Sequence, residues 1–509
     1  MPPPSVQDQA DARNNLAISL IDAGRLEQAV LACHQAIVLE PNFAEAHNNL
    51  AVALKKLGRH DEAITACSAA IALRPTYAEA HSNLGNALFE TGRIEPAITA
   101  YRRALDLKPD YLAALNNLGT ALGKAGQFNQ AIDAYTAAIK LKPNVAEVHN
   151  NLGVSLGGVG RLDEAIGSFR RAIQINSAYA EAWANLGAVL CDSGDGESAL
   201  AACRRAIELR PDLAIAHSNY ALILLRLGQY ELGWPEHEWR FKCNPKFRPR
   251  NFSQPRWDGS PLAGRTILLH AEQGWGDTIQ FVRYAPLVAN RGGRVILECQ
   301  PELIRLLGDL PGVEQLVPFG ETLPSFDLHC PLLSLPAAFG TTLNSIPSDV
   351  PYLKATDDWR NRLSGHHMKI GLVWAGRPTH TNDHNRSVHL SHFSSLRQIP
   401  NVSFFSLQKG PAAAQTGLEL IDFTSELNDF ADTAALINAL DLVISVDTAV
   451  AHVAGALGKP VWVLLPMSAD WRWLTERNDS PWYPSMRLFR QTRWGDWDQV
   501  VQNIARALT

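Results

Sequence analysis

The sequence predicts a helical solenoid followed by an α/β region with two sheet domains. The first observation is a period of 34 residues that runs from about residue 10 to 230. The second is the stretch from Asp441 to Pro466, whose order of apolar and small residues predicts a strand, a tight turn, a short helix and a parallel strand. The third is the distribution of tryptophan. Twelve of the 13 tryptophans lie from Trp234 onward, which indicates a different kind of domain after the repeats.

Glycine, alanine and proline recur in phase through the periodic region. Each unit carries a glycine between its two predicted helices, from Gly24 to Gly228, and most units end on a proline such as Pro41, with Ser177 at the one missing step. A period of this length is typical of stacked helical hairpins, in which small residues let the helices cross closely. The pattern resembles the tetratricopeptide repeat, with six full units and a partial seventh.

One column of the repeats carries asparagine in all seven units. The resemblance implies that this position faces the concave groove, where an amide can donate to and accept from a backbone peptide group. The column is similar to the asparagine ladder of protein O-linked N-acetylglucosamine transferase, which implies a polypeptide client in the groove. The alternative is that these amides stabilise the array or serve another partner. The column consists of Asn15 and the predicted groove residues Asn49, Asn83, Asn117, Asn151, Asn185 and Asn219.

The turn after the predicted strand Leu442–Val446 has the features of an anion site. Asp447 and Thr448 are good helix N-caps, and the free N–H groups at the helix start would point toward a phosphate. His452 lies one turn into the helix, where it can donate to an anionic ligand. The alternative is an ordinary turn that Asp447 caps and in which His452 packs. The residues predicted to bind the ligand are Asp447, Thr448, Ala449, Val450, Ala451 and His452.

The spacing D-T-x-x-x-H-x-A-x-A-x-G-x-P over residues 447–460 resembles the donor-site signature of the heptosyltransferases, glycosyltransferase family 9. This resemblance implies two Rossmann-like domains in the GT-B arrangement, with the nucleotide diphosphate of a sugar donor on this helix. The sequence departs from the family at Ala449, where the heptosyltransferase motif usually has glycine.

A second loop, Ala271–Asp277, follows the predicted strand Thr266–His270 and precedes a helix predicted from about Thr278 to Ala289. It is not the dinucleotide fingerprint, which would need glycine where Ile279 stands. Its glycine-aspartate pair matches that of the heptosyltransferases, whose aspartate is the proposed catalytic base. The resemblance therefore implies Asp277 as the base. If Asp277 is not the base, Glu272 in the same loop is the next candidate. The alternative is that Asp277 only caps the helix.

The second sheet domain begins with the predicted strand Lys369–Trp374 and a polar loop. Arg386 in this loop falls about where heptosyltransferases place a lysine or arginine near the donor phosphate. Three histidines of the loop match no usual metal-ligand spacing, so no metal site is predicted. Gln408 and Lys409 lie at the carboxyl end of the predicted strand 404–408, where a nucleoside would bind.

The C-terminal part contains two further features. The cluster Trp471–Trp473, with arginine between two tryptophans, either borders the cleft or packs. The GT-B resemblance implies that a final helix over 497–508 crosses back to the first sheet domain. Asp496 and Asp498 are interpreted as helix caps rather than metal ligands.

The predicted domains are the array at 10–230, a coupling segment at 231–264, a first sheet domain at 265–350 and a second at 365–509.

Composition excludes several classes of function. The net charge is −5, from 46 basic and 51 acidic side chains, so no strong positive field indicates nucleic-acid binding. No apolar run is long enough to span a membrane, and the N-terminus lacks the basic start and apolar core of a signal peptide. The seven cysteines include no C-x-x-C pair and are predicted to be structural. We therefore expect a cytoplasmic protein.

These features together predict a metal-independent glycosyltransferase that takes a nucleotide diphosphate sugar as co-substrate and needs no cofactor. The resemblance implies inversion at the anomeric carbon, and the favoured acceptor is a polypeptide held by the repeats. Two alternatives remain open at this point. One is a non-catalytic tetratricopeptide scaffold with a degenerate glycosyltransferase domain, and the other is an enzyme that acts on a glycan or lipid-linked sugar.

Overall fold

The computed structural model describes residues 5–243, 250–380 and 382–509, and the chain divides into two compact units. The first is Met1–Ser193 with Glu208–Arg210, and the second is Gly194–Ile207 with Pro211–Thr509. The second unit therefore begins before residue 230, the predicted end of the array, so the last repeat helices fold with the sheets. Residues 244–249 of the predicted coupling segment lie outside the described residues.

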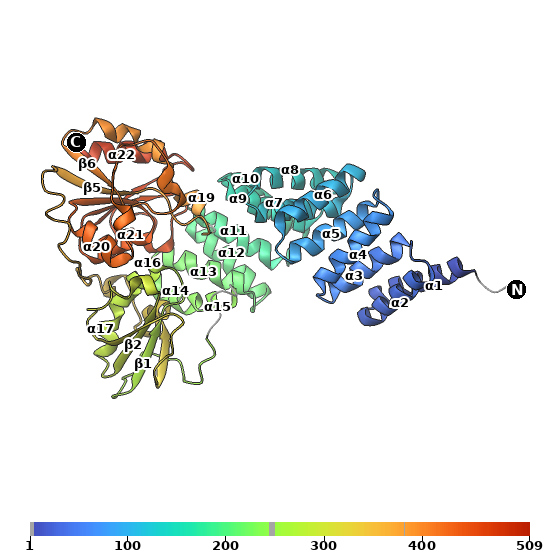
Figure 1. The fold of residues 1–509 in the computed structure, drawn as a ribbon, viewed down its shortest axis with the longest axis horizontal. Helices are drawn as coiled ribbons and strands as arrows, with labels where there is room; N and C mark the ends of the chain where they lie inside the picture. Colours follow the sequence, from blue (N-terminus) through green and yellow to red (C-terminus); the bar gives the residue numbers. More distant parts are fainter. Residues whose placement is uncertain (1–4, 244–249, 381) are drawn as a thin grey trace. The chain divides into compact units, whose positions relative to one another are not determined.

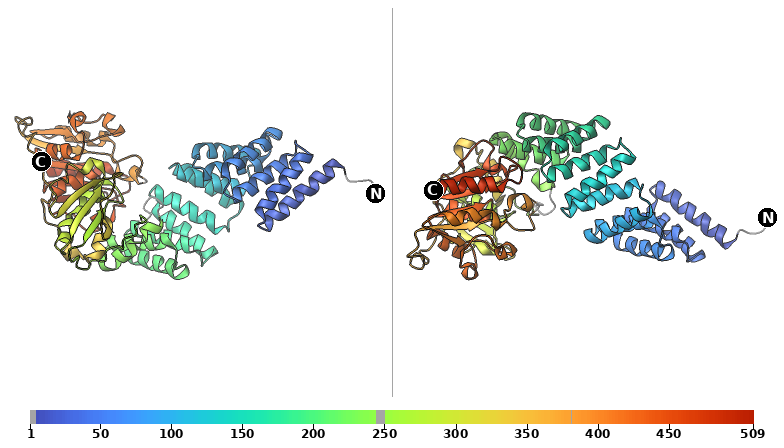
Figure 2. Two further views of the ribbon diagram at one scale, coloured as in Figure 1. Left: turned by 60° about the horizontal axis from the view of Figure 1, so that its bottom comes forward. Right: turned by 90° about the horizontal axis from the view of Figure 1, so that it is seen from above.

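The first unit consists of antiparallel helix pairs stacked one after another (Figures 1 and 2). The turn glycine of each pair adopts a left-handed backbone, for example Gly24 with φ +71°, which side chains with a Cβ disfavour. Cys33 and Cys67 are completely buried between helices, as expected of small apolar fillers. The helices are α1 (Val6–Asp22), α2 (Leu26–Leu39), α3 (Ala44–Lys56), α4 (His60–Leu73), α5 (Ala78–Glu90), α6 (Ile94–Leu107), α7 (Leu112–Lys124), α8 (Phe128–Leu141), α9 (Ala146–Gly158), α10 (Leu162–Ile175) and α11 (Ala180–Asp192).

The second unit starts with α12 (Gly196–Leu209), α13 (Ala214–Arg226), α14 (Tyr230–His237) and α15 (Arg240–Cys243). Helix α14 shares a hydrophobic core with both sheets. The indole Nε1 of Trp234 donates to the carbonyl of Thr341 at 2.8 Å, and Nε1 of Trp482 donates to the Tyr230 hydroxyl at 3.3 Å. The junction helix α14 is thus anchored to the α/β region.

Sheet A contains four parallel strands in the order β3-β2-β1-β4 (Figure 1). The predicted helix from Thr278 to Ala289 is wrong in its bounds, because the chain forms α16 (Trp275–Phe281), a 3-10 turn and then α17 (Ala285–Ala289). Pro286 in the first turn of α17 has no N–H to continue the preceding helix. The strands are β1 (Thr266–His270), β2 (Arg294–Cys299), β3 (Val313–Pro318) and β4 (Leu328–Pro331).

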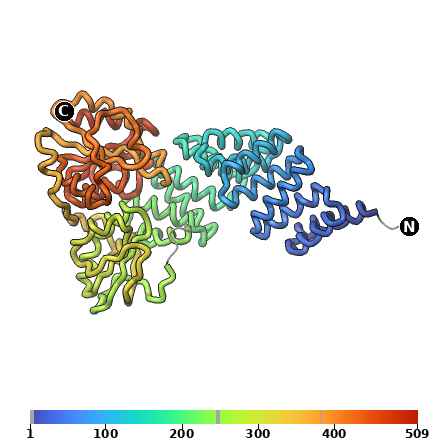
Figure 3. Tube along the Cα trace, viewed as in Figure 1, coloured from blue at the N-terminus to red at the C-terminus, as the bar shows by residue number. Residues whose placement is uncertain are grey.

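Sheet B contains six parallel strands in the order β10-β9-β8-β5-β6-β7. The predicted parallel pairing of the two strands around the central motif is confirmed, because Val443 pairs with Val461. The course of the chain through this sheet is visible in Figure 3. The strands are β5 (Met368–Val373), β6 (Val402–Ser406), β7 (Ile421–Asp422), β8 (Leu442–Val446), β9 (Val461–Leu465) and β10 (Met486–Arg490).

The remaining helices connect the strands or cover the sheets. The α-helices are α18 (Leu335–Ala338), α19 (Asp383–Arg386), α20 (Phe430–Asn438), α21 (Ala449–Ala456) and α22 (Trp497–Leu508). The 3-10 helices are η2 (Val282–Tyr284), η3 (Pro301–Leu303), η4 (Leu332–Ser334), η5 (Leu343–Ser345), η6 (Leu390–Gln398), η7 (Pro411–Ala414), η8 (Thr424–Glu426) and η9 (Trp471–Trp473).

The final helix does not cross back to sheet A, so that prediction is wrong. Helix α22 buries Trp497, Val500 and Ile504 in the core of sheet B, together with Phe393 of η6. The apolar face of this amphipathic helix packs on sheet B. Asp496 caps α22 by accepting from the N–H of Gln499 at 3.1 Å, as predicted. Among the described residues, no helix combines the length and the apolar character needed to cross a bilayer.

Candidate active site

Two helix starts from different sheets meet at the candidate site. Helix α16 follows β1 of sheet A, and α21 follows β8 of sheet B. A Cβ atom placed on Gly276 would lie 2.9 Å from Cδ2 of His452 and 3.5 Å from the Cα of Ala449. Only glycine therefore allows α16 to approach α21 this closely.

The start of α21 is open to a ligand. Thr448 is the N-cap residue with an extended backbone, φ −141° and ψ 169°, but its side chain caps no backbone N–H. Its hydroxyl lies 3.1 Å from the Ser445 hydroxyl instead. The N–H groups of Ala449 and Val450 belong to the first turn, where the helix offers them no acceptor. Thr448 thus takes the predicted N-cap position without a side-chain cap, and the helix leaves these N–H groups without an acceptor.

Arg386 reaches the same turn from the loop after β5. Its Nη1 donates to the backbone carbonyl of Asp447 at 3.0 Å, and its Nε lies 3.4 Å from the carboxylate of Asp383. Gly376 leaves space for it, because a Cβ there would lie 2.5 Å from Arg386 Nη2. The structure therefore brings Arg386 to the Asp447 turn, the place that the resemblance implied.

The carboxyl group of Asp447 is perturbed by its surroundings. Burial raises its pKa, and the nearby carboxylate of Asp470 raises it further, to about 6, although Arg386 and Arg472 act in the opposite direction. Near neutral pH the ionised form is therefore less favourable in the folded protein than in the unfolded chain.

We expect this shift to appear in the pH dependence of stability. The folded pKa of Asp447 lies above the reference value of 3.8. Its contribution to stability is thus fully present below about pH 4 and lost as the pH rises through about 6. Between pH 4 and pH 7 the parent should therefore lose about 1 to 3 kcal/mol more unfolding free energy than the Asp447→Asn variant loses. Urea unfolding of both proteins at the two pH values measures this difference. Asp309→Asn, at an exposed position, is the control. A parent and an Asp447→Asn variant with parallel pH profiles would contradict the shift.

His452 lies in the packing between the two helix starts. Its side chain is 4% exposed, its Nδ1 lies 3.0 Å from the Tyr483 hydroxyl, and its ring stacks on Trp473. Burial lowers the pKa of His452 well below its usual value, and the positive charges of Arg472 and Arg283 lower it further. The ring is therefore neutral, and its predicted contact with an anion would use a neutral N–H.

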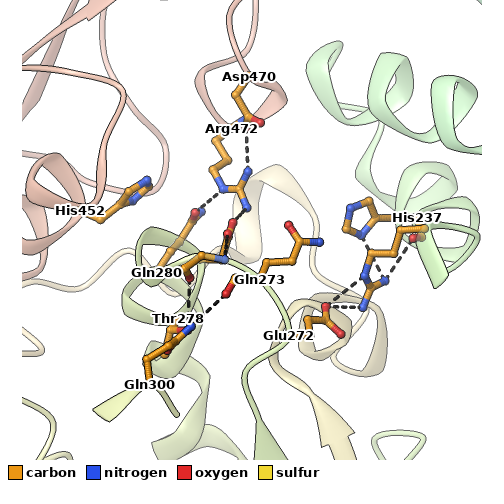
Figure 4. A network of polar contacts seen from close by, with 12 residues as sticks. His237, Glu272, Gln273, Thr278, Gln280, Gln300, His452, Asp470 and Arg472 are labelled. Atoms are coloured by element: carbon orange, nitrogen blue, oxygen red, sulfur yellow. Dashed lines mark hydrogen bonds and ion pairs between the residues drawn. The ribbon is translucent and has the colours of Figure 1, made fainter. Parts of the chain in front are cut away.

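Asp277 is both a helix-capping residue and part of an ion pair. One carboxylate oxygen accepts from the N–H of Gly274 at 2.9 Å, and the other pairs with the guanidinium of Arg472. The side chain keeps 20% of its surface exposed. Figure 4 shows Arg472 between Asp470 and the α16 residue Gln280, with hydrogen bonds to both. Asp277 thus caps α16, as the alternative stated. It also lies where α16 and α21 meet.

Arg472 and Asp470 were not among the predicted site residues. The sequence offered one signal, the arginine between two tryptophans, but packing was an equally good interpretation of it. Asp470 caps η9 by accepting from the Arg472 N–H at 3.0 Å and also pairs with the Arg472 guanidinium at 2.9 Å. A short motif of this kind does not reveal which distant carboxylate its arginine will meet.

Two predicted nucleoside contacts are occupied by backbone groups instead. The side-chain oxygen of Gln408 accepts from the N–H groups of Trp374 and Ala375 at 3.1 and 2.8 Å. The ammonium of Lys409 donates to the carbonyl of Leu427. Strand β6 ends at Ser406, before the predicted end at 408, because the Gln408 side chain braces the end of β5. Gln408 thus braces the end of β5 and Lys409 contacts the loop before α20, while their predicted contacts with a nucleoside stay a prediction.

Glu272, the second base candidate, belongs to a different network. Its carboxylate pairs with the buried Arg240 at 2.7 Å. Burial raises the pKa of Glu272 to about 7, although Arg240 acts in the opposite direction. Figure 4 shows this pair beside His237, on the other side of the loop from Arg472. The structure thus separates Glu272 from the start of α21.

The asparagine column forms hydrogen bonds between neighbouring repeats. Each bond runs from the side-chain amide of one column residue to a side-chain oxygen of the preceding repeat. The observed pairs are Asn49 to Asn14 at 2.8 Å, Asn83 to Asn48 at 2.9 Å, Asn117 to Asn86 at 2.8 Å, Asn151 to Asn116 at 3.4 Å and Asn185 to Asn150 at 3.0 Å. These five column residues are partly exposed, as is Asn219, so the amides both join repeats and keep some accessible polar surface.

Comparison with known families agrees with this division of the chain. Residues 423–503 match the family model "Glycosyltransferase family 9 (heptosyltransferase)". The matched segment lies in the C-terminal part of the chain. This segment contains the Asp447 motif, so the resemblance predicted from that motif is confirmed. Tetratricopeptide repeat models match residues 19–58, 42–110, 116–181, 151–214 and 185–233, which confirms the repeats.

Individual relatives share part of the chain. Protein FlbA of Caulobacter vibrioides is 28% identical over 323 residues, which are 56% of this chain and 53% of FlbA. The chain thus spans about half the length of this curated relative.

Solved structures of tetratricopeptide repeat proteins are similar to part of the chain. YrrB, described as a TPR protein with an unusual peptide-binding site, is 26% identical. The match covers 36% of this chain and 95% of YrrB, with a TM-score of 0.33. TTC0263, a thermophilic TPR protein of Thermus thermophilus, is 24% identical, covers 36% of this chain and 99% of its own, and has a TM-score of 0.31.

Proposed function

We propose that this chain is a glycosyltransferase that moves a sugar from a nucleoside diphosphate donor to a hydroxyl group of a polypeptide. The observation that carries the proposal is the meeting of α21 and α16. The start of α21 offers free N–H groups and Arg386, and α16 supplies the carboxylate of Asp277. The family 9 match over residues 423–503 supports the same reaction class. The two parallel sheets are compatible with the GT-B arrangement, which we include in the proposal.

The proposed chemistry follows from the charges at this point. The donor diphosphate binds the N–H groups of Ala449 and Val450 and the guanidinium of Arg386, which stabilise the negative charge that develops on it. The acceptor oxygen attacks the anomeric carbon, and the bond from that carbon to the diphosphate oxygen breaks. Asp277 takes the proton from the acceptor hydroxyl. Attack on the side opposite the leaving group inverts the anomeric centre, and the protein's own donors replace a metal ion.

The repeat array is the proposed acceptor-binding part. A cavity of about 580 Å³ in the first unit is lined by Asn86 and Asn117 together with Lys55, Lys56 and Tyr101. Asn117 belongs to the asparagine column, so part of the column borders a hollow that can hold a side chain of an extended polypeptide. The amide groups that remain accessible there suit a backbone peptide group.

We expect the column to act in acceptor binding beyond its structural hydrogen bonds. Replacing Asn83, Asn117 and Asn151 together by alanine should lower kcat/KM for long polypeptide acceptors about 10-fold or more. Donor binding should stay unchanged. Short acceptors should lose less, because they contact fewer repeats. The same variant should lose roughly 1 to 3 kcal/mol of stability from three inter-repeat hydrogen bonds.

A matched control separates the two roles. Replacing Asn48 and Asn116 by alanine removes two of these hydrogen bonds from the acceptor side and keeps both the column and the cavity residue Asn86. The matching column variant replaces Asn83 and Asn151, and equal losses of acceptor affinity in these two double variants would show that the hydrogen bonds matter and that the column does not contact the client.

The direct test of the proposed function is a scan of nucleotide sugars. Calorimetry should find one nucleoside diphosphate that binds, and long incubation with the matching nucleotide sugar should release free sugar slowly even without an acceptor. Failure of every common nucleoside diphosphate to bind would support the non-catalytic scaffold. Donor hydrolysis together with transfer to glycans, and none to polypeptides, would keep the donor half of the proposal and overturn the acceptor half.

A further inference from the structure

Arg472 links sheet B to the candidate base on sheet A. Its Nε donates to the side-chain oxygen of Gln280 at 2.6 Å, its Nη1 to Asp470 at 2.9 Å, and its Nη2 to Asp277. Gln280 and Asp277 both belong to α16, whereas Arg472 belongs to η9. The side chain is 9% exposed. A planar guanidinium with three directed hydrogen bonds holds its partners in one geometry.

The charge of Arg472 persists despite its burial. Burial alone would lower its pKa, but the carboxylates of Asp470 and Asp277 outweigh this effect and raise the pKa above the usual value. The guanidinium is therefore a permanent positive charge beside Asp277. The two oxygens of Asp277 are both engaged, one by Arg472 and one by the N–H of Gly274, so the carboxylate cannot rotate freely.

An aromatic cluster around Trp471 fixes the loop that carries Arg472. The Trp471 ring centroid lies 5.3 Å from that of Trp234, 6.4 Å from that of Tyr230 and 6.1 Å from that of Trp482. Trp234 and Tyr230 belong to α14, the helix that follows the last repeat glycine. The guanidinium of Arg472 itself lies 4.4 Å from the Trp471 ring centroid. The junction helix therefore supports Arg472 through the Trp471 ring.

We propose that Arg472 is a positioning residue for the transfer reaction: it aims the carboxylate of Asp277 at the acceptor hydroxyl, and α14 holds it in place for this purpose. This inference rests on the proposed function. The proton still passes from the acceptor to Asp277, and Arg472 only donates hydrogen bonds. The role makes the junction helix part of the active-site support, in agreement with the hydrophobic core that α14 shares with both sheets.

A double-mutant cycle tests the proposal on the full chain. Arg472→Met should lower kcat about 10- to 100-fold and change the donor KM less than about 3-fold, because it disturbs the base and not the donor site. In the Asp277→Asn background the same change should cost less than about 2-fold, since its target is gone. Arg472→Lys keeps the charge without the planar fork and should recover part of the loss. If Arg472→Met does not fold, the cycle is run with Arg472→Lys.

Arg305→Met is the matched control. Arg305 follows η3 of the sheet A region and pairs with Asp429 at 2.9 Å and Asp432 at 3.1 Å, next to α20 of the sheet B region. It therefore joins the same two regions at an exposed place, and kcat should stay within about 2-fold of the parent. Equal losses from Arg305→Met and Arg472→Met, or an Arg472→Met loss of the same size in both backgrounds, would overturn the positioning role. A fully active Arg472→Met would overturn it and leave the proposed function standing. A parent that neither binds nor hydrolyses any nucleotide sugar would overturn both.

Discussion

Asp277→Asn should lower the kcat of transfer at least about 100-fold, to a slow but measurable rate, and leave donor binding intact. The amide can still accept from the N–H of Gly274, so the helix cap survives, but it cannot take the proton of the acceptor hydroxyl. General-base assistance is worth a factor of about 10² to 10⁴, and the loss of kcat should fall within or beyond this range. Initial rates at saturating donor, with calorimetric binding of the nucleoside diphosphate, measure the two properties separately.

The ion pair with Arg472 requires a control variant. Asp470→Asn removes the other carboxylate from Arg472, at 2.9 Å, and leaves Asp277 in place. It should lose a similar amount of stability and no more than about 10-fold in kcat. Gly276→Ala is unsuitable as a control, because its Cβ would lie 2.9 Å from the buried His452 ring. An Asp277→Asn enzyme within a few-fold of the parent would mean that the base lies elsewhere.

Ala449→Pro should weaken binding of the nucleoside diphosphate about 10- to 100-fold. Ala449 is the first residue of α21, where proline fits well and removes one N–H. The preceding Thr448 already has the extended backbone that proline requires of its neighbour. The fold should therefore survive, while the phosphate loses a charge-assisted hydrogen bond worth roughly 1.5 to 3 kcal/mol. Calorimetric titration with the nucleotide found by the scan measures the change.

A second proline substitution, in the repeats, is the matched control. Ala146→Pro also places proline at the first residue of a helix, α9, after the extended Val145. This variant should bind the diphosphate as the parent does, with a similar thermal midpoint. Unchanged affinity in a folded Ala449→Pro variant would exclude this N–H from the donor site, and equal weakening in both variants would indicate a general effect of proline.

Local pattern was sufficient to predict the repeats and several strands. The phase of glycine, alanine and proline depends on contacts within and between adjacent hairpins, and the array follows from it. Strands β1, β8 and β9 coincide with the predicted 266–270, 442–446 and 461–465, since runs of apolar residues between turns report burial on both faces. The turn at Asp447 was predicted from the same kind of local pattern, whereas the position of Arg386 near it was implied by the family resemblance.

The contacts that complete the candidate site come from packing between segments far apart in the chain. Asp277 and Arg472 are 195 residues apart, and their pairing depends on how α16 approaches α21 through Gly276. The occupation of Gln408 by two backbone N–H groups and the packing of α22 on sheet B were also decided by tertiary structure. A hydrophobic period states which face of an element is buried. It carries no information on which other element covers that face, because many apolar surfaces satisfy the same pattern. The sequence by itself therefore determined the repeat array, several strands and the turn at Asp447, whereas the tertiary structure alone decided which charges meet there.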